Sequence, residues 1–258
     1  MSTIDLNSDV GESFGAYRLG ADADVMRSIT SANVACGFHA GDPGVMRQTV
    51  RLAREAGVAV GAHPGFPDLV GFGRRELRAS PREVEDMVLY QIGALAAIAA
   101  SESVTLAHVK AHGALYNMAA RDRALADAIA RAVRAFDRSL VLFGLPGSEL
   151  LAAGTAAGLR VASEGFADRA YAPDGSLAPR TAPGSVIHDA EDVLSRSLRM
   201  VTSGQVTATD GSTLAFPVDT LCVHGDTAGA AELTRLLRAG LAQRDVVVRA
   251  FRPQADRA

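Results

Sequence analysis

Lys110 is the only lysine among the 26 basic residues of this chain, and it lies between two histidines in the segment His108-Val109-Lys110-Ala111-His112. An ammonium group is a compact charge whose pKa falls on burial, whereas a guanidinium stays charged at any working pH. Arginine therefore cannot replace Lys110 in proton transfer, which makes Lys110 a candidate catalytic residue. The alternative is that a compositional bias towards arginine left one lysine by chance.

The residues before Lys110 predict how its side chain is placed. Residues 104–110 form a short apolar and β-branched run, which is typical of a buried strand. Side chains alternate along a strand, so His108, Lys110 and, if the strand continues, His112 would project to one face. A helix would also bring the two histidines together, but the zinc-protease motif needs Glu directly after the first histidine, and Val109 is there.

Other polar side chains gather at or just after the ends of predicted strands. They lie in the segments Asp5 to Glu12, Asn33 to Asp42, His63 to Asp68, Glu164 to Tyr171 and Cys222 to Asp226. A single histidine at a strand end is more often satisfied by backbone or water, and His-Gly-Asp also makes a turn and a helix cap. Together these positions favour one shared site, because active sites of β/α barrels lie at the C-terminal ends of the strands.

Short β-rich runs alternate with helical ones along the chain. The predicted strands are 4–8, 32–36, 58–62, 104–110, 140–144, 159–163 and 220–223, with 246–251 as a candidate eighth. The clearest predicted helices are 43–56, 81–100, 122–136, 189–202 and 228–243. This alternation predicts an α/β fold in which residues 1–258 form one (β/α) barrel of seven or eight strands. An open doubly wound sheet is the alternative.

Three irregular segments interrupt this pattern. Residues 205–216 show two alternating runs about an Asp-Gly turn, which predicts a peripheral β-hairpin. Residues 64–80 and 164–183 are long connections rich in Gly, Pro, Asp and Arg. Long loops without secondary structure commonly cover or line a site, so we expect both to do so.

Composition narrows the class of protein. The chain has 258 residues, 48% of them hydrophobic and 21% charged, with a net charge of −3, which suits a large core and excludes a disordered protein. This charge favours neither nucleic acid nor an anionic membrane as a partner, so we expect small-molecule chemistry. The start lacks signal-peptide features and the apolar segments look too short or interrupted to span a bilayer, which predicts a cytoplasmic protein. In that compartment Cys36 and Cys222 are expected as buried thiols rather than a disulfide.

Six ordered blocks of residues resemble the LamB/YcsF family, whose members form the A subunit of bacterial 5-oxoprolinase. The blocks are Asp5 to Glu12, Asn33 to Asp42, His63 to Asp68, Val109 to Asn117, Glu164 to Tyr171 and Cys222 to Thr227. The resemblance spans nearly the whole chain. It implies a barrel like that of the glycoside hydrolase/deacetylase superfamily, and the reaction of 5-oxo-L-proline, ATP and water to L-glutamate, ADP and phosphate. It also implies partners, namely 5-oxoprolinase subunits B and C.

ATP would be a co-substrate in this reaction, but the sequence lacks the usual motifs for binding it. A P-loop needs Gly-Lys-Ser/Thr, and the single lysine is followed by Ala111. A glycine-rich dinucleotide fingerprint is also missing. Our hypothesis is that nucleotide and carbonyl activation belong largely to the partner subunits, while this chain holds the lactam or its phosphorylated form and opens the ring.

Roles follow from residue type and position. Lys110 would face an oxyanion or phosphoryl oxygen, His112 or His63 would accept a proton from water, and Asp9 would orient or assist that water. Arg169 or Arg180 would bind the substrate carboxylate through a bidentate fork. The wider set of expected binding residues is Glu12, Asn33, His39, Asp42, Asn117, Glu164, Asp168, Arg169, Tyr171, Arg180, His224 and Asp226.

Two other functions stay open at this point. A metal-dependent deacetylase or hydrolase on the same barrel would use Asp9, His39 and His63 as ligands, an Asp with two His that leaves positions open for water. A non-catalytic subunit would only capture a small carboxylate or support a complex. The crowding of ionisable groups at one rim speaks against the second alternative, because such groups are costly to bury and are usually retained for chemistry.

Overall fold

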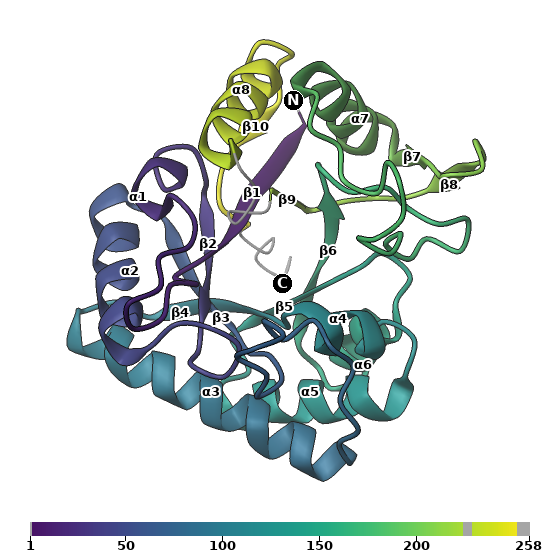
Figure 1. The fold of residues 1–258 in the computed structure, drawn as a ribbon. Coiled ribbons are helices and arrows are strands. Elements are labelled where there is room, and N and C mark those ends of the chain that lie inside the picture. The colour runs from purple at the N-terminus through teal and green to yellow at the C-terminus, as the bar shows by residue number, and fades with distance from the viewer. Residues whose placement is uncertain (1, 224–228, 252–258) are drawn as a thin grey trace, which may run out of the picture.

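A closed barrel of parallel strands forms the centre of the computed structural model, which describes residues 2–223 and 229–251 (Figure 1). Within these residues seven strands pair in the order β1-β2-β3-β4-β5-β6-β9, and β9 pairs back with β1. The barrel strands are β1 (Thr3–Val10), β2 (Ser31–Ala35), β3 (Ala59–His63), β4 (Leu106–Lys110), β5 (Val141–Gly144), β6 (Arg160–Phe166) and β9 (Thr220–Cys222). The predicted barrel is confirmed, and the pairing of β1 with β9 rules out the open sheet.

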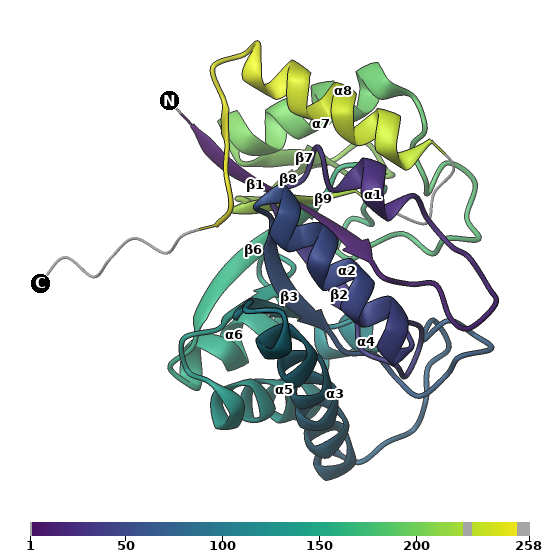
Figure 2. The same cartoon turned by 90° about the vertical axis from the view of Figure 1, so that its left-hand side faces the viewer.

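Helices cover the outside of the barrel (Figures 1 and 2). They are α1 (Asp22–Val25), α2 (Pro43–Ala56), α3 (Pro81–Ser101), α4 (Gly113–Ala119), α5 (Arg123–Phe136), α6 (Glu149–Ala156), α7 (Ala190–Ser203) and α8 (Ala230–Ala242). The five predicted helices are present at nearly the predicted bounds. Helices α1, α4 and α6 were not predicted, because each has eight residues or fewer and shows too little of the helical period.

Helix α3 begins with a capping box in which Ser80 and Glu83 satisfy each other's backbone N–H groups, and Pro81 occupies the first turn. It packs along α5 and over β3 (Figure 2). Among the described residues it is the one helix long and apolar enough to cross a membrane by length and composition, so the expectation that all apolar segments are too short or interrupted is wrong for this helix. A single such helix is weak evidence for a membrane, because core helices pass the same test.

The segment predicted as an eighth strand does not enter the barrel. β10 (Val247–Val248) pairs only with Thr3 and Ile4, at the start of β1. The barrel is completed without it, because β2 pairs with β1 from Asn7 onward and β9 pairs with β1 from Asp5. The hairpin lies at β7 (Gln205–Thr207) and β8 (Thr213–Ala215), an antiparallel pair beside α7 (Figure 1).

The two faces of the barrel strands differ in polarity. On β1 the residues Ile4 and Leu6 belong to the apolar core between the strands and the surrounding helices. Their neighbours Asp5, Asn7 and Asp9 alternate with them and are also buried, on the inner face. The inner face also holds a small apolar group made of Val141, Phe143 and Ala162. The barrel therefore encloses a largely polar interior that opens at the C-terminal ends of the strands.

Candidate active site

A chain of hydrogen bonds crosses the barrel interior and ends on Asp9. Asp9, Asn33, Gly61 and His108 are in register on β1 to β4. His108 Nε2 donates to Asn33 Oδ1 at 2.7 Å, and Asn33 Nδ2 donates to Asp9 Oδ1 at 2.8 Å. Gly61 makes room for the imidazole, because a Cβ atom there would lie 2.2 Å from the His108 ring. Burial lowers the pKa of His108 to about 3, so it is a neutral donor at physiological pH.

Lys110 ends β4 with its ammonium group between two buried carboxylates. Its Nζ lies 2.9 Å from Asp9 Oδ1, 2.8 Å from Glu164 Oε1 and 3.1 Å from Cys222 Sγ. Burial by itself lowers the pKa of Lys110, but the charges of Asp9 and Glu164 outweigh it and raise that pKa well above its ordinary value. Lys110 is therefore a permanent cation. The arrangement favours its role in stabilising negative charge over the proton transfer that an isolated buried lysine would suggest.

Three residues around Lys110 were not among the expected site residues. The Phe166 ring lies 5.0 Å from Lys110 Nζ, and Cys222 contacts the same atom. Burial and the neighbouring Glu164 raise the pKa of Tyr116 well above its ordinary value, so its hydroxyl stays protonated. Alternation with Thr220 on β9 could have indicated that Cys222 points inward. Tyr116 gave no such signal, because α4 was not predicted.

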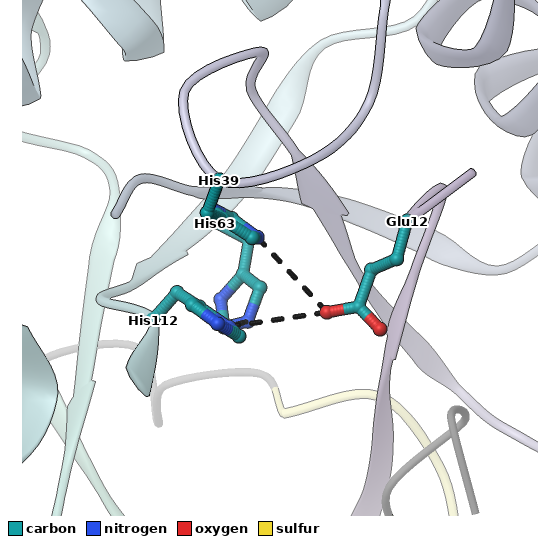
Figure 3. A group of neighbouring side chains, drawn as sticks. All are labelled: Glu12, His39, His63 and His112. Carbon is teal, nitrogen blue, oxygen red and sulfur yellow. Dashed lines mark hydrogen bonds and ion pairs between the residues drawn. The ribbon is translucent and has the colours of Figure 1, made fainter. Parts of the chain in front are cut away.

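Three histidines and a glutamate meet beside this ion pair (Figure 3). His63 Nε2 lies 3.3 Å from Asp9 Oδ2 and 2.9 Å from His112 Nδ1. Glu12 Oε1 lies 3.9 Å from His112 Nδ1 and 4.0 Å from His39 Nε2. The rings of His39 and His112 stack with centroids 3.8 Å apart. Burial lowers the pKa values of His39 and His112 well below the ordinary value, which leaves both rings neutral.

The connection from 64 to 80 packs its backbone against these histidines. Phe72 has a left-handed φ of 55°, unusual for a residue other than glycine, and its carbonyl accepts a hydrogen bond from His112 Nε2 at 2.8 Å. Gly73 follows with φ 62°, and a Cβ there would lie 2.8 Å from both His39 and His112. The close packing of this loop thus depends on a glycine and fixes the orientation of His112.

A cavity of about 390 Å³ lies over the ion pair, in the size range of small-molecule sites. Its wall includes all four residues expected to be catalytic, together with Asn117, Tyr116 and Phe166, and three arginines from the two long connections. The catalytic candidates and the arginines are Asp9, His63, Lys110, His112, Arg74, Arg169 and Arg180. Both connections line the cavity, as predicted. Three guanidinium groups make this cavity suited to an anionic small molecule.

Arg169 is held in place by its own loop. Its Nη2 donates to the Ala178 carbonyl at 2.6 Å and its Nε donates to the Ser185 carbonyl at 3.2 Å. Burial lowers the pKa of Arg169 to about 10, which leaves it charged at neutral pH. Arg169 therefore shapes the loop that carries Arg180 into the cavity wall.

Some of the expected binding residues lie away from the cavity. Asp42 caps α2 by accepting from the backbone N–H groups of Gly44 and Val45. The Tyr171 hydroxyl accepts from the Phe166 backbone N–H at 2.6 Å, and its ring packs against Phe216. Asp168 is buried and does not line the cavity. His224 and Asp226 lie outside the described residues.

The residues that could hold a metal ion differ from the set suggested by the sequence. His39 and His63 are joined by Glu12 and His112, whose ligand atoms all lie within 4.8 Å of one another. Asp9 instead pairs with Lys110, although Asp9 Oδ2 stays near His63. Three imidazoles and one carboxylate fit a divalent transition metal, and such an ion, when bound, supplies Lewis acidity to a nearby oxygen.

Comparisons with known proteins identify the family of this chain and agree with its fold. The model of the LamB/YcsF family matches residues 4–256. A protein from Symbiobacterium thermophilum, named as the A subunit of 5-oxoprolinase, is 61% identical, covering 98% of this chain and 96% of its own. The crystal structure of a lactam utilization protein from Thermus thermophilus superposes with a TM-score of 0.91 at 54% identity, covering 96% of this chain and 100% of its own.

A more distant structure shares the fold alone. It is a protein from Enterococcus faecalis that is named for cellobiose-phosphate cleavage, with a TM-score of 0.56 at 13% identity, covering 96% of this chain and 97% of its own. The match of the family model over nearly all the described residues, together with high identity to named relatives, settles the relationship. The chain belongs to the LamB/YcsF family.

Proposed function

We propose that this chain is the ring-opening subunit of an ATP-dependent 5-oxoprolinase, which hydrolyses 5-oxo-L-proline to L-glutamate while ATP is cleaved to ADP and phosphate. The Symbiobacterium thermophilum relative, at 61% identity and named for 5-oxoprolinase, supports this reaction. The observation that carries the proposal is the buried Lys110 cation held by Asp9 and Glu164 in the wall of a cavity that arginines surround. This arrangement suits a small anion whose carbonyl oxygen gains negative charge during reaction.

Water attack on a lactam needs a base and a stabilised oxyanion. The five-membered lactam is an unstrained amide, so phosphorylation of its oxygen before attack gives water a better electrophile. Asp9 accepts the water proton, because Asn33 and Lys110 hold its carboxylate in place at the cavity wall. Lys110 faces the developing negative charge on the former carbonyl oxygen or on its phosphoryl group. The ring C–N bond then breaks as its nitrogen takes the proton held by Asp9, which gives an acyl phosphate of glutamate. A second water molecule cleaves this acyl phosphate to release glutamate and phosphate.

The histidines are less suited to act as the base. His112 Nε2 contacts the Phe72 carbonyl, and His63 Nε2 occupies the space in front of His112 Nδ1, at 2.9 Å. His63 Nδ1 contacts the Lys110 carbonyl, and His63 Nε2 contacts His112. Asp9 is therefore favoured among the residues that the sequence suggested for this step.

Arg180 is the candidate for the substrate carboxylate. Arg169 donates hydrogen bonds to the carbonyls of Ala178 and Ser185, whereas Arg180 lies in the cavity wall on the same loop. A guanidinium can bind a carboxylate through two parallel hydrogen bonds, which would also orient the ring towards Lys110.

Nucleotide handling belongs, in this proposal, mainly to two partner proteins, 5-oxoprolinase subunits B and C. The relative is named as one subunit of its enzyme, which supports the existence of partners, and the sequence of this chain lacks a P-loop. A cytoplasmic location stays a prediction. The test is to incubate the chain with 5-oxoproline and ATP, with and without both partners, and to assay glutamate and ADP. Glutamate formed only in the full mixture supports the proposal, and none in any mixture contradicts it.

A metal-dependent hydrolase on the same barrel is the second candidate, favoured by the cluster of Glu12 with three histidines. Stoichiometric metal in protein purified without an affinity tag, with activity lost to a chelator and no need for ATP, would favour it over the first. A purely binding role is tested by alanine substitutions at Asp9, Lys110 and His112. If these abolish turnover and leave the complex assembled, the chain takes part in the chemistry.

A further inference from the structure

We propose that Glu12, His39, His63 and His112 form a binding site for one divalent transition-metal ion, next to the Lys110 ion pair. One ligand atom from each of these buried side chains lies within 4.8 Å of all the others (Figure 3). Clustering alone does not require a metal. The orientation of the imidazoles is the stronger reason.

The tautomers of two histidines are set by backbone carbonyls. His63 Nδ1 lies 2.8 Å from the Lys110 carbonyl oxygen, and His112 Nε2 lies 2.8 Å from the Phe72 carbonyl oxygen. A carbonyl oxygen only accepts, so each of these nitrogens carries the proton. In a neutral imidazole the opposite nitrogen then presents a lone pair. Metal-bound histidines commonly show this pattern, with the outer N–H donated to a carbonyl or carboxylate.

The two remaining nitrogens face each other. His63 Nε2 and His112 Nδ1 are 2.9 Å apart, a distance at which two lone pairs repel unless a positive charge lies beside both. Asp9 cannot supply that charge, and Lys110 Nζ is directed to Asp9, Glu164 and Cys222. A metal cation that both nitrogens coordinate resolves the conflict.

His39 supplies independent evidence. Its side chain is fully buried, and neither ring nitrogen has a hydrogen-bond partner among the described residues. Burying an imidazole without partners is unfavourable, and an ion bound to one of its nitrogens would remove this cost. His39 Nε2 points to the same space as the other ligands, 4.0 Å from Glu12 Oε1.

The donor set indicates the kind of ion. Three neutral imidazoles with one carboxylate suit Zn²⁺ or Co²⁺ better than Mg²⁺ or Ca²⁺, which prefer oxygen ligands. The packing of Gly73 against His39 and His112 holds two ligands in place before any ion binds. The proposal is independent of ring opening, because the affinity of the site for metal can be measured without substrate, ATP or partners.

The experiment uses untagged full-length protein stripped with a chelator and dialysed. Co²⁺ is added while its visible d–d absorption is recorded, and Zn²⁺ binding is measured by calorimetry. We expect one equivalent per chain, a Co²⁺ spectrum typical of nitrogen and oxygen ligation, and displacement of Co²⁺ by Zn²⁺. His39→Gln and Glu12→Gln should each weaken binding by at least about tenfold to 100-fold, because they remove a ligand and loss of an outer hydrogen-bond partner alone has an effect of that size.

His188→Gln is the matched control, because His188 is an exposed histidine outside the cluster. It should bind as the unaltered chain does. Circular dichroism checks that each variant is folded, and Glu12→Gln keeps the size of the side chain should His39→Gln fail that check. Binding that is absent, or equal in all three variants, would overturn the proposal and leave a proton shared between His63 and His112. If the unaltered chain binds the metal but no 5-oxoprolinase activity is found in the complete mixture, the metal site stands and the proposed function is contradicted instead.

Discussion

Lys110 Nζ lies 2.9 Å from Asp9 Oδ1 in the barrel interior, and the lysine side chain is only 2% exposed. The two residues are 101 positions apart in the chain, on β4 and β1, with β2 and β3 between them. Parallel pairing carries both to the C-terminal opening of the barrel. A buried ion pair of this kind contributes little net stability by itself, so its position in the cavity wall fits a role in chemistry.

Two substitutions of Lys110 distinguish the effect of its positive charge from the effect of the shape of its side chain. Lys110→Met leaves Asp9 and Glu164 buried without their cation, which should lower the free energy of unfolding by about 3–5 kcal/mol. Lys110→Arg keeps the charge but places a larger planar group between the carboxylates, so turnover should fall about 100-fold or more. Denaturant unfolding and glutamate release measure the two effects. Full activity of folded Lys110→Arg would contradict the role of Lys110.

Even a small substitution inside the barrel should lower the free energy of unfolding. Gly61→Ala places a methyl group 2.2 Å from the His108 ring, which should destabilise the protein by about 1–3 kcal/mol through overpacking. Gly93→Ala is the control, since Gly93 lies in helix α3 with open space around it and alanine there should stabilise by about 0.5–1 kcal/mol. Equal unfolding midpoints for the two variants would show that His108 does not occupy this space.

Substrate binding should separate the two arginines of the second long connection. Arg180→Ala is expected to raise the KM for 5-oxoproline about tenfold or more with little change in kcat, because a charge-assisted hydrogen bond is worth about 1.5–3 kcal/mol. Arg169→Ala should lower kcat as well, because it releases the loop held at Ala178 and Ser185. Arg82→Ala, on the exposed side of α3, serves as the control. An unchanged KM in Arg180→Ala would remove Arg180 from the carboxylate site.

Acid stability should depend on Glu102, which follows α3 and pairs with three arginines of α2. Arg51 and Arg47 lower the pKa of Glu102 from 4.5 to about 2. A carboxyl with a lowered folded pKa stabilises the protein above its unfolded pKa, and this contribution is lost as the pH falls from 4.5 through about 2. In the Glu102→Gln variant the melting temperature should therefore fall less steeply with decreasing pH over this range than in the unaltered chain. Exposed Glu55→Gln is the comparison, and equal curves for both would contradict the assignment.

Much of the fold could be predicted because its signals are local. The period of apolar residues predicts the long helices, and the alternation of Asp5, Asn7 and Asp9 with apolar residues indicates a polar interior from the sequence alone. The position of β10 outside the barrel could not be predicted, because its sequence is typical of a strand. Only the pairing of the strands shows that the barrel is complete without it. The short helix α4 was also missed, and with it Tyr116.

The sequence indicates which residues belong to the site better than it indicates which of them contact one another. Asp9 is level with Gly61 and His108 in the barrel, and His63 and Lys110 follow two residues later on the same strands, so all three side chains meet near the C-terminal opening, as their strand-end positions suggested. The choice of Glu12 over Asp9 beside the histidines depends on how the chain turns after β1, and sequence spacing does not contain that turn. Asp42 looked like a binding residue but caps α2, because an aspartate before Pro43 serves both purposes equally well in sequence.

The central claim is that this chain opens the lactam ring with Lys110 at the reacting oxygen. The most direct test is single-turnover formation of glutamate from 5-oxoproline and ATP, in the complete mixture of the chain with its two partners, comparing the unaltered chain with Lys110→Arg. We predict glutamate at full rate with the unaltered chain and a loss of about 100-fold with the variant, while the variant still associates with the two proposed partner subunits. Glutamate at equal rates in both mixtures would contradict the claim.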